Sequence, residues 1–366
     1  MYKRLDHIDA LRGLAALAII LFHLVRIPTP NLPLPNYLNF ISTKFDLGVP
    51  MFFIISGFSI FYSLSSRRID SNWILNFYAR RFSRIAPLFY FMLVFWLFRD
   101  ALLGYLRPLY DIIINILFVY NFFPGKHQSI VWAGWPISIE MFFYLFAPFL
   151  FRLIDSFRKS ILLLSLSLCF SAFFKVLLVS IDAIPKDYYY KNIATHLPFL
   201  SLGIVIFFIY QQINTDRSKL NLFFLFFIVT TAYLFASESN FLPIPVWLRF
   251  YHKYIWGLFL SSLLIILGNY GLKVFVNKVT QYCGKLSYSL YLGHPFIIYS
   301  LSPLYKKIYN NLNADISAFF VCILMTIPLI FVAAFMLYNL VENPVRKFSY
   351  KFINKHFGTS ARPPMR

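Results

Sequence analysis

The sequence predicts an all-α fold, a polytopic membrane bundle of about ten transmembrane helices. Of its 366 residues, 59% are hydrophobic and 13% are charged, whereas soluble domains carry roughly a quarter charged residues. Apolar runs of spanning length recur along the whole chain. The lysines and arginines between these runs are distributed unevenly, as in proteins that cross a membrane many times.

Ten apolar runs are long enough to cross a bilayer. A shorter apolar stretch at 111–123 is predicted to be re-entrant or interfacial, because a complete crossing there would invert every later loop. The ten predicted spans cover residues 8–26, 45–65, 85–103, 136–154, 160–181, 196–212, 221–237, 251–270, 287–302 and 316–341.

Positive charge sets the predicted orientation. Of the 34 lysines and arginines, 21 fall on the N-terminal side of the membrane and eleven on the other, while Arg12 and Lys175 lie within spans. Since cytoplasmic loops are enriched in lysine and arginine, both termini are predicted to be cytoplasmic. Residues 1–345 then form one membrane domain, and residues 346–366 form a short basic cytoplasmic tail.

Neither the positive charge nor the cysteines indicate a nucleic-acid or metal-binding site. The net charge of +20 is spread over short loops with no recognition module, so no nucleic-acid partner is expected. Cys169, Cys283 and Cys322 are scattered without metal-ligand spacing, so no metal site is expected either.

Arg12 and His23 are two ionisable residues inside the first predicted span. Eleven residues make nearly three helical turns, so both project from almost the same face, about 16 Å apart along the axis. Asp9 lies one turn before Arg12 and is predicted to pair with it. Ionisable residues at membrane depth indicate a functional site; the alternative is a snorkelling arginine and a packed histidine.

Predicted depth arranges the remaining candidates into two groups. A cationic inner group suits phosphates, because the planar guanidinium grips phosphate oxygens and keeps its charge. A membrane-embedded and outer group has the residue types needed for general acid–base chemistry. The inner group comprises Arg12, Arg81, Arg84, Glu342 and Arg346, and the outer group comprises His23, Asp46, Glu140 and His294.

Several candidates also have a purely structural interpretation. Arg81 and Arg84 are typical of topology determinants, and Glu342 of a residue that anchors the last span. His294 precedes Pro295, where it can bond backbone groups that the proline leaves unpaired. Ser56 and Gly57 are typical of close helix packing.

Several segments, in this order, resemble the acyltransferase-3 family of membrane acyltransferases. They are IDALRGLAALAIILFH with Arg12 and His23, LGVPMFFIISGF (47–58), YARRFSRIAPLF (78–89), WPISIEMFFYLFAPF (135–149), LSYSLYLGHPF (286–296) and VENPVRKF (341–348). The family moves acyl groups, most often acetyl, from cytoplasmic acyl-CoA to hydroxyls of extracytoplasmic glycans such as lipopolysaccharide O-antigen or exopolysaccharide. The chain departs from the family at Pro50, where many members carry an acidic residue, and at Pro136, where a serine often follows the tryptophan.

The resemblance implies a multi-pass O-acetyltransferase of the bacterial inner membrane, with acetyl-CoA as donor and a glycan as acceptor. His23 is expected to act as base on an acceptor hydroxyl that Glu140 or Asp46 orients, and a transient acetyl-histidine is a variant of this mechanism. Two other classes stay open, a transporter or flippase for a lipid-linked glycan and an envelope scaffold. The donor phosphates are assigned to Arg12, Arg81 and Arg84, and acceptor binding to Trp135, Ser56 and His294.

Overall fold

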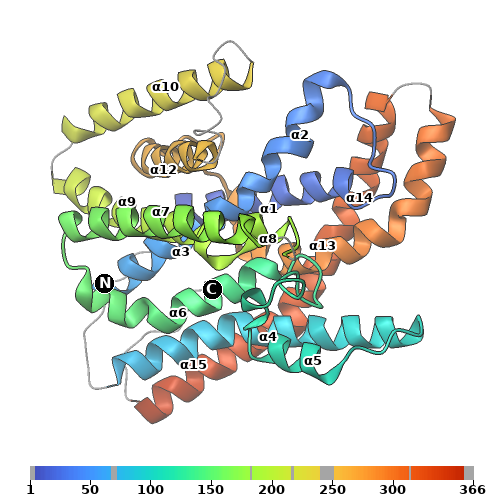
Figure 1. Ribbon diagram of the computed structural model, residues 1–366, viewed down its shortest axis with the longest axis horizontal. Coiled ribbons are helices and arrows are strands. Elements are labelled where there is room, and N and C mark those ends of the chain that lie inside the picture. The colour runs from blue at the N-terminus through green and yellow to red at the C-terminus, as the bar shows by residue number, and fades with distance from the viewer. Residues whose placement is uncertain are drawn as a thin grey trace. The chain divides into compact units, whose positions relative to one another are not determined.

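The computed structural model describes residues 5–66, 72–181, 184–215, 218–239, 251–312 and 315–357, and every regular element within these ranges is a helix (Figure 1). The chain divides into two compact units. Unit 1 comprises Met1–Ile19, Asp46–Arg67 and Phe149–Lys285, and unit 2 comprises Ile20–Phe45, Arg68–Pro148 and Leu286–Arg366.

Fourteen α-helices account for most of the described chain. Three short 3-10 helices and one π-helical segment lie between them. The α-helices are α1 (Asp6–Arg26), α2 (Asn39–Lys44), α3 (Gly48–Ser65), α4 (Trp73–Leu102), α5 (Leu109–Ile116), α6 (Trp135–Leu153), α7 (Phe157–Val179), α8 (Tyr188–Lys191), α9 (Ile193–Thr215), α10 (Ser218–Glu238), α12 (His252–Tyr270), α13 (Lys278–Asn311), α14 (Asp315–Leu337) and α15 (Asn343–Phe357). These segments are η1 (Asn36–Leu38), η2 (Phe45–Leu47), η3 (Tyr120–Phe122) and the π-helical η4 (Tyr338–Glu342).

Nine helical stretches among the described residues are long and apolar enough to cross a membrane. They match nine of the ten predicted spans. The tenth, 287–302, lies inside α13, a helix of 34 residues whose lysines and tyrosines make its average composition more polar. The prediction of a polytopic all-α membrane protein is confirmed.

The segment predicted to be re-entrant or interfacial is too short to cross a membrane. Its helix α5 has eight residues, about 12 Å at the α-helical rise. The Asn115 side-chain oxygen accepts hydrogen bonds from the Ser129 hydroxyl (2.7 Å) and the Ile130 amide (3.1 Å). These bonds tie α5 to the loop that leads into α6.

In unit 1, glycines allow two helices to approach closely. A Cβ atom at Gly57 of α3 would collide with the Leu200 carbonyl oxygen of α9, and one at Gly203 of α9 would collide with the Ile54 carbonyl oxygen of α3. Gly57 is therefore a close-packing residue, as one sequence interpretation proposed. Helix α7 also packs on α9, and α10 packs on α12 (Figure 1).

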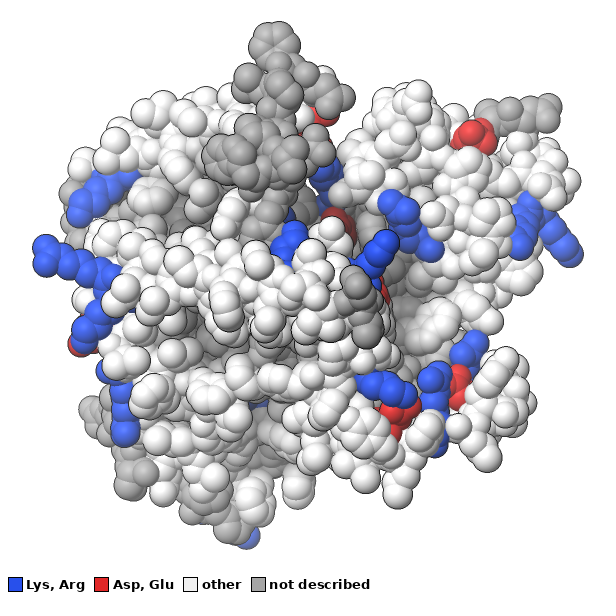
Figure 2. Space-filling view, viewed as in Figure 1, with Lys and Arg blue, Asp and Glu red and all other residues white. Residues whose placement is uncertain are grey.

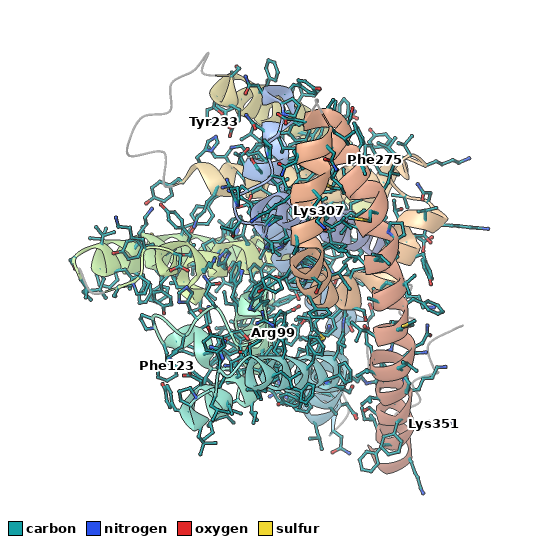
Figure 3. The ribbon with its side chains drawn as sticks, turned by 90° about the vertical axis from the view of Figure 1, so that its right-hand side faces the viewer. Arg99, Phe123, Tyr233, Phe275, Lys307 and Lys351 are labelled. Carbon is teal, nitrogen blue, oxygen red and sulfur yellow. The ribbon has the colours of Figure 1, made fainter. Side chains whose placement is uncertain are left out.

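In unit 2, α14 continues through η4 into α15, which packs against α4. Figure 3 shows α14 and α15 following one another along one line, with Lys351 near the far end of α15. The Tyr305 hydroxyl of α13 lies 2.7 Å from the Thr326 hydroxyl of α14. The first part of the predicted tail, 346–357, is thus helical, and 358–366 lie outside the described residues.

Apolar side chains cover much of the described surface. In the most apolar windows of α7 and α10, only 17% and 22% of the residues are buried. Phe173 of α7 is 66% exposed and Phe235 of α10 is 77% exposed. Figure 2 shows lysines and arginines scattered over a largely uncharged face. Such a surface is typical of contact with lipid.

Candidate active site

Arg12 is held by two partners within unit 1. Its Nη1 atom lies 3.6 Å from Oδ1 of Asp9, one turn earlier on α1, as predicted. Its Nη2 atom donates a hydrogen bond of 3.1 Å to the Ser59 hydroxyl of α3. The Arg12 and Asp9 side chains are 15% and 12% exposed. The guanidinium therefore has a fixed orientation without being fully enclosed.

Close helix packing fixes the turn of α1 that carries Arg12. A Cβ atom at Gly13 would collide with the Thr280 carbonyl oxygen, and one at Gly284 would collide with the carbonyl oxygen of Asp9. Both contacts join α1 to the first turns of α13 within unit 1. Asp9 and Arg12 therefore sit on a helix face that has no room to shift.

Unit 2 brings His23 and His294 together. Nδ1 of His23 lies 2.8 Å from Nε2 of His294, and the ring centroids are 4.9 Å apart with an angle of 27° between the planes. The other nitrogen of His294, Nδ1, lies 3.1 Å from the Leu290 carbonyl oxygen. His294 is completely buried.

The arginines of the RRFSR stretch lie within α4 and not in the loop before it. Helix α4 begins at Trp73, twelve residues earlier than the predicted span. The guanidinium carbon of Arg81 lies 5.4 Å from the Tyr144 ring centroid and 5.5 Å from that of Phe77. The Tyr144 hydroxyl donates a short hydrogen bond to the Glu140 carboxylate.

A second carboxylate completes this group of charges. Glu342 is 4% exposed and accepts a hydrogen bond of 2.9 Å from the Ser289 hydroxyl. The positive charge of Arg84 interacts with both Glu140 and Glu342. We call Arg81, Arg84, Glu140, Tyr144 and Glu342 the α4 arginine cluster. It combines two guanidinium groups, which can bind phosphate, with two carboxylates and a phenol.

The other predicted site residues lie at helix starts or in packed helices. Asp46 is exposed in η2, just before α3, and Ser56 is buried within α3. Trp135 is the first residue of α6. Arg12, Asp46 and Ser56 belong to unit 1, and the remaining candidates belong to unit 2. Glu140, which predicted depth placed with His23, has Tyr144 and Arg84 among its neighbours.

Three contacting residues were missed at the sequence level. Tyr144 follows Glu140 by four residues on one helix, and this spacing alone could have identified it. Ser59 and Ser289 meet their partners across 47 and 53 residues of chain, and no local pattern indicates such contacts. Over the described ranges, no group of three or more His, Cys, Asp or Glu side chains is placed to hold a metal ion.

Comparison with known proteins identifies relatives along almost the whole chain. A Staphylococcus aureus (strain COL) protein, named provisionally as an O-acetyltransferase, is 28% identical over 393 residues that cover 96% of this chain and 59% of the relative. The peptidoglycan O-acetyltransferase OatA of Listeria monocytogenes is 26% identical, covering 94% of this chain and 56% of the relative. A protein of Acidianus two-tailed virus, named provisionally as an acetyltransferase, is 27% identical, covering 80% and 84%.

These relatives differ from this chain in length. The chain spans less than two thirds of the Staphylococcus and Listeria proteins. No solved structure matches it significantly. The model of the acyltransferase-3 family, described as an acyltransferase domain, matches residues 5–335. The chain therefore belongs to the acyltransferase-3 family.

Proposed function

We propose that the protein transfers an acetyl or other short acyl group from cytoplasmic acyl-CoA to a hydroxyl of an extracytoplasmic glycan. Lipopolysaccharide O-antigen and exopolysaccharide are the acceptors we favour, and the bacterial inner membrane is the location. The observation that carries the proposal is the contact of the half-buried His23 with the buried His294, in a chain of the acyltransferase-3 family. The name of the Listeria relative, a peptidoglycan O-acetyltransferase, supports a glycan hydroxyl as the acceptor class.

The donor binds through arginines in this proposal. CoA carries several phosphates, and guanidinium groups grip phosphate oxygens by paired hydrogen bonds. Arg81 and Arg84 supply two such groups on α4, one turn apart on the same helix. In unit 1, Arg12 is a separate candidate for a donor phosphate, and Asp9 and Ser59 fix its orientation.

His23 acts as the general base of the transfer. Its imidazole takes the proton from the acceptor hydroxyl, and the hydroxyl oxygen forms a bond to the thioester carbonyl carbon. The carbon–sulfur bond then breaks, and the leaving thiolate receives the proton from His23. The products are the acyl ester of the glycan and free CoA. On the acceptor side, we assign orientation to Glu140 and binding to Trp135, which both belong to unit 2.

The decisive experiment uses inverted membrane vesicles supplied with radiolabelled acetyl-CoA. We expect label on envelope glycan with the wild-type protein and none with His23→Ala. His252→Ala is the matched control, because His252 lies at the start of α12, its ring lies 3.8 Å from the Glu238 carboxylate, and no step of the proposed reaction uses it.

The variants must first be shown to be folded, by monodisperse elution in detergent and an unchanged melting temperature. Transfer that survives in His23→Ala would remove His23 from the reaction. Absence of transfer by the wild type, with several acyl-CoA donors and glycans tried, would overturn the proposed function. Glycan that crosses the membrane without any acyl donor would identify a transporter instead.

A further inference from the structure

We propose that His294 is a positioning residue that holds His23 in one tautomer, with the proton on Nδ1 and the lone pair on Nε2. This inference rests on the proposed function, because it assigns His23 the role of base. It moves His294 from acceptor binding, where the sequence placed it, to the support of the base.

The hydrogen-bond directions follow from a single carbonyl group. The Leu290 carbonyl oxygen can only accept, so Nδ1 of His294, 3.1 Å away, must carry its proton and donate. A neutral imidazole carries one N–H, so Nε2 of His294 is an acceptor. The bond of 2.8 Å to His23 therefore requires Nδ1–H on His23 as its donor. The lone pair of His23 is then on Nε2.

Burial favours this neutral pair over a charged one. His294 is completely buried, and burial of a charge without a partner costs several kcal/mol or more. Were His294 doubly protonated, its Nε2–H would donate to His23 and force the opposite tautomer, with a proton on Nε2. When both imidazoles are neutral and His294 donates to the Leu290 carbonyl oxygen, no charge is buried and that cost does not arise.

The turn of α13 that carries His294 is itself fixed. Tyr291 lies three residues before His294 on α13. Its hydroxyl donates a hydrogen bond of 2.6 Å to the Ala133 carbonyl oxygen. The Tyr291 ring centroid lies 5.9 Å from that of His294. The acceptor nitrogen presented to His23 therefore has a defined place, which an orienting residue needs.

The arrangement serves both halves of the proton transfer. When Nε2 of His23 takes the hydroxyl proton, the ring becomes an imidazolium whose Nδ1–H still donates to His294. When the thiolate leaves, the same Nε2 returns the proton. His294 gains and loses no proton in this cycle, so its contribution is orientation and tautomer choice.

Two amide variants separate this role from a space-filling one. The side-chain oxygen of Gln reaches about as far as Nε2 of a histidine, so His294→Gln keeps an acceptor for the His23 Nδ1–H. The amide nitrogen of Asn reaches about as far as Nδ1, so His294→Asn keeps the donor to Leu290 and loses the contact with His23. The two variants share polarity and differ in which bond they retain.

For His294→Asn we expect kcat to fall about 100-fold, within the range that a general base contributes, with KM for acetyl-CoA and acceptor unchanged within about twofold. We expect His294→Gln to recover most of kcat. Equal activities of the two folded variants, or a loss expressed mainly in KM, would overturn the positioning role.

A spectroscopic measurement tests the tautomer independently of activity. Solid-state ¹⁵N spectra of histidine-labelled protein in lipid, assigned with His23→Gln and His294→Gln, should show His23 with a protonated Nδ1 and a non-protonated Nε2. A protonated Nε2 on His23 in the resting protein would overturn the inference. If the wild type transfers no acyl group but shows this tautomer, the proposed function fails and the His23–His294 geometry stands.

Discussion

The Asp100→Asn substitution tests how the end of α4 is stabilised. Asp100 is 3% exposed and pairs with two arginines of unit 2. Arg99 Nη1 lies 3.0 Å from one carboxylate oxygen, and Arg107 Nε and Nη2 lie 2.7 and 2.6 Å from the other. Three aromatic rings also contact Arg99, which is labelled in Figure 3: those of Trp96, Trp132 and Tyr299, with centroids 5.2, 5.6 and 4.9 Å away.

The expected loss follows from these partners. A hydrogen bond to a charged group contributes about 1.5–3 kcal/mol, and loss of one partner from a buried ion pair costs about 3–5 kcal/mol. The Arg107 side chain is 39% exposed and Arg99 is 20% exposed, so water replaces part of what is lost. We therefore expect a destabilisation of about 3 kcal/mol, at the lower end of that range.

The assay is thermal unfolding of the purified protein in detergent, where this loss corresponds to a fall in Tm of about 4 °C. Asp155→Asn is the matched control. Asp155 also contacts a basic residue, Lys159 at 2.6 Å, but its side chain is 62% exposed. The hydrogen bond from Lys159 lowers the pKa of Asp155, and water screens the pair, so no measurable shift is expected. Equal Tm values for the two variants would refute this reasoning.

Two further predictions concern the donor site and the helix packing. Arg12→Lys keeps the charge but loses the forked guanidinium that reaches both Asp9 and Ser59, so KM for acetyl-CoA should rise about 10-fold; an unchanged KM would contradict the assignment of Arg12 to the donor phosphates. Gly203→Leu should destabilise the protein by about 1–3 kcal/mol, because its side chain would meet the backbone of α3 at Ile54. A smaller loss of Tm is expected for Gly203→Ala, and no loss in either variant would contradict the close contact.

The sequence predicted the all-α membrane fold well, because span length and polarity are local properties. The predicted span 85–103 lies within α4 except for its last residue, but the sequence did not show that the helix begins twelve residues earlier, at Trp73. The residues from Trp73 to Arg84 are too polar on average to be recognised by hydropathy, so Arg81 and Arg84 fell outside the predicted span.

The candidate site was only partly predictable. The pairing of Arg12 with Asp9 is an i, i+3 contact, which a sequence displays directly. The contact of His23 with His294 joins residues 271 positions apart, and only tertiary packing sets its geometry. Sequence reasoning identified both histidines by residue type and depth, and it could not supply their hydrogen-bond directions.

The stretch Asp315–Ile353, formed by α14, η4 and α15, contains 39 residues. At the α-helical rise it measures about 58 Å, nearly twice the hydrocarbon thickness of about 30 Å. Helix α14 alone, with 23 residues, is long enough to cross that layer. When α14 does so, α15 lies beyond the hydrocarbon, together with the part of α4 that packs against it. Arg81 and Arg84 then lie near the membrane–water boundary, where a donor dissolved in water can reach them without entering the lipid.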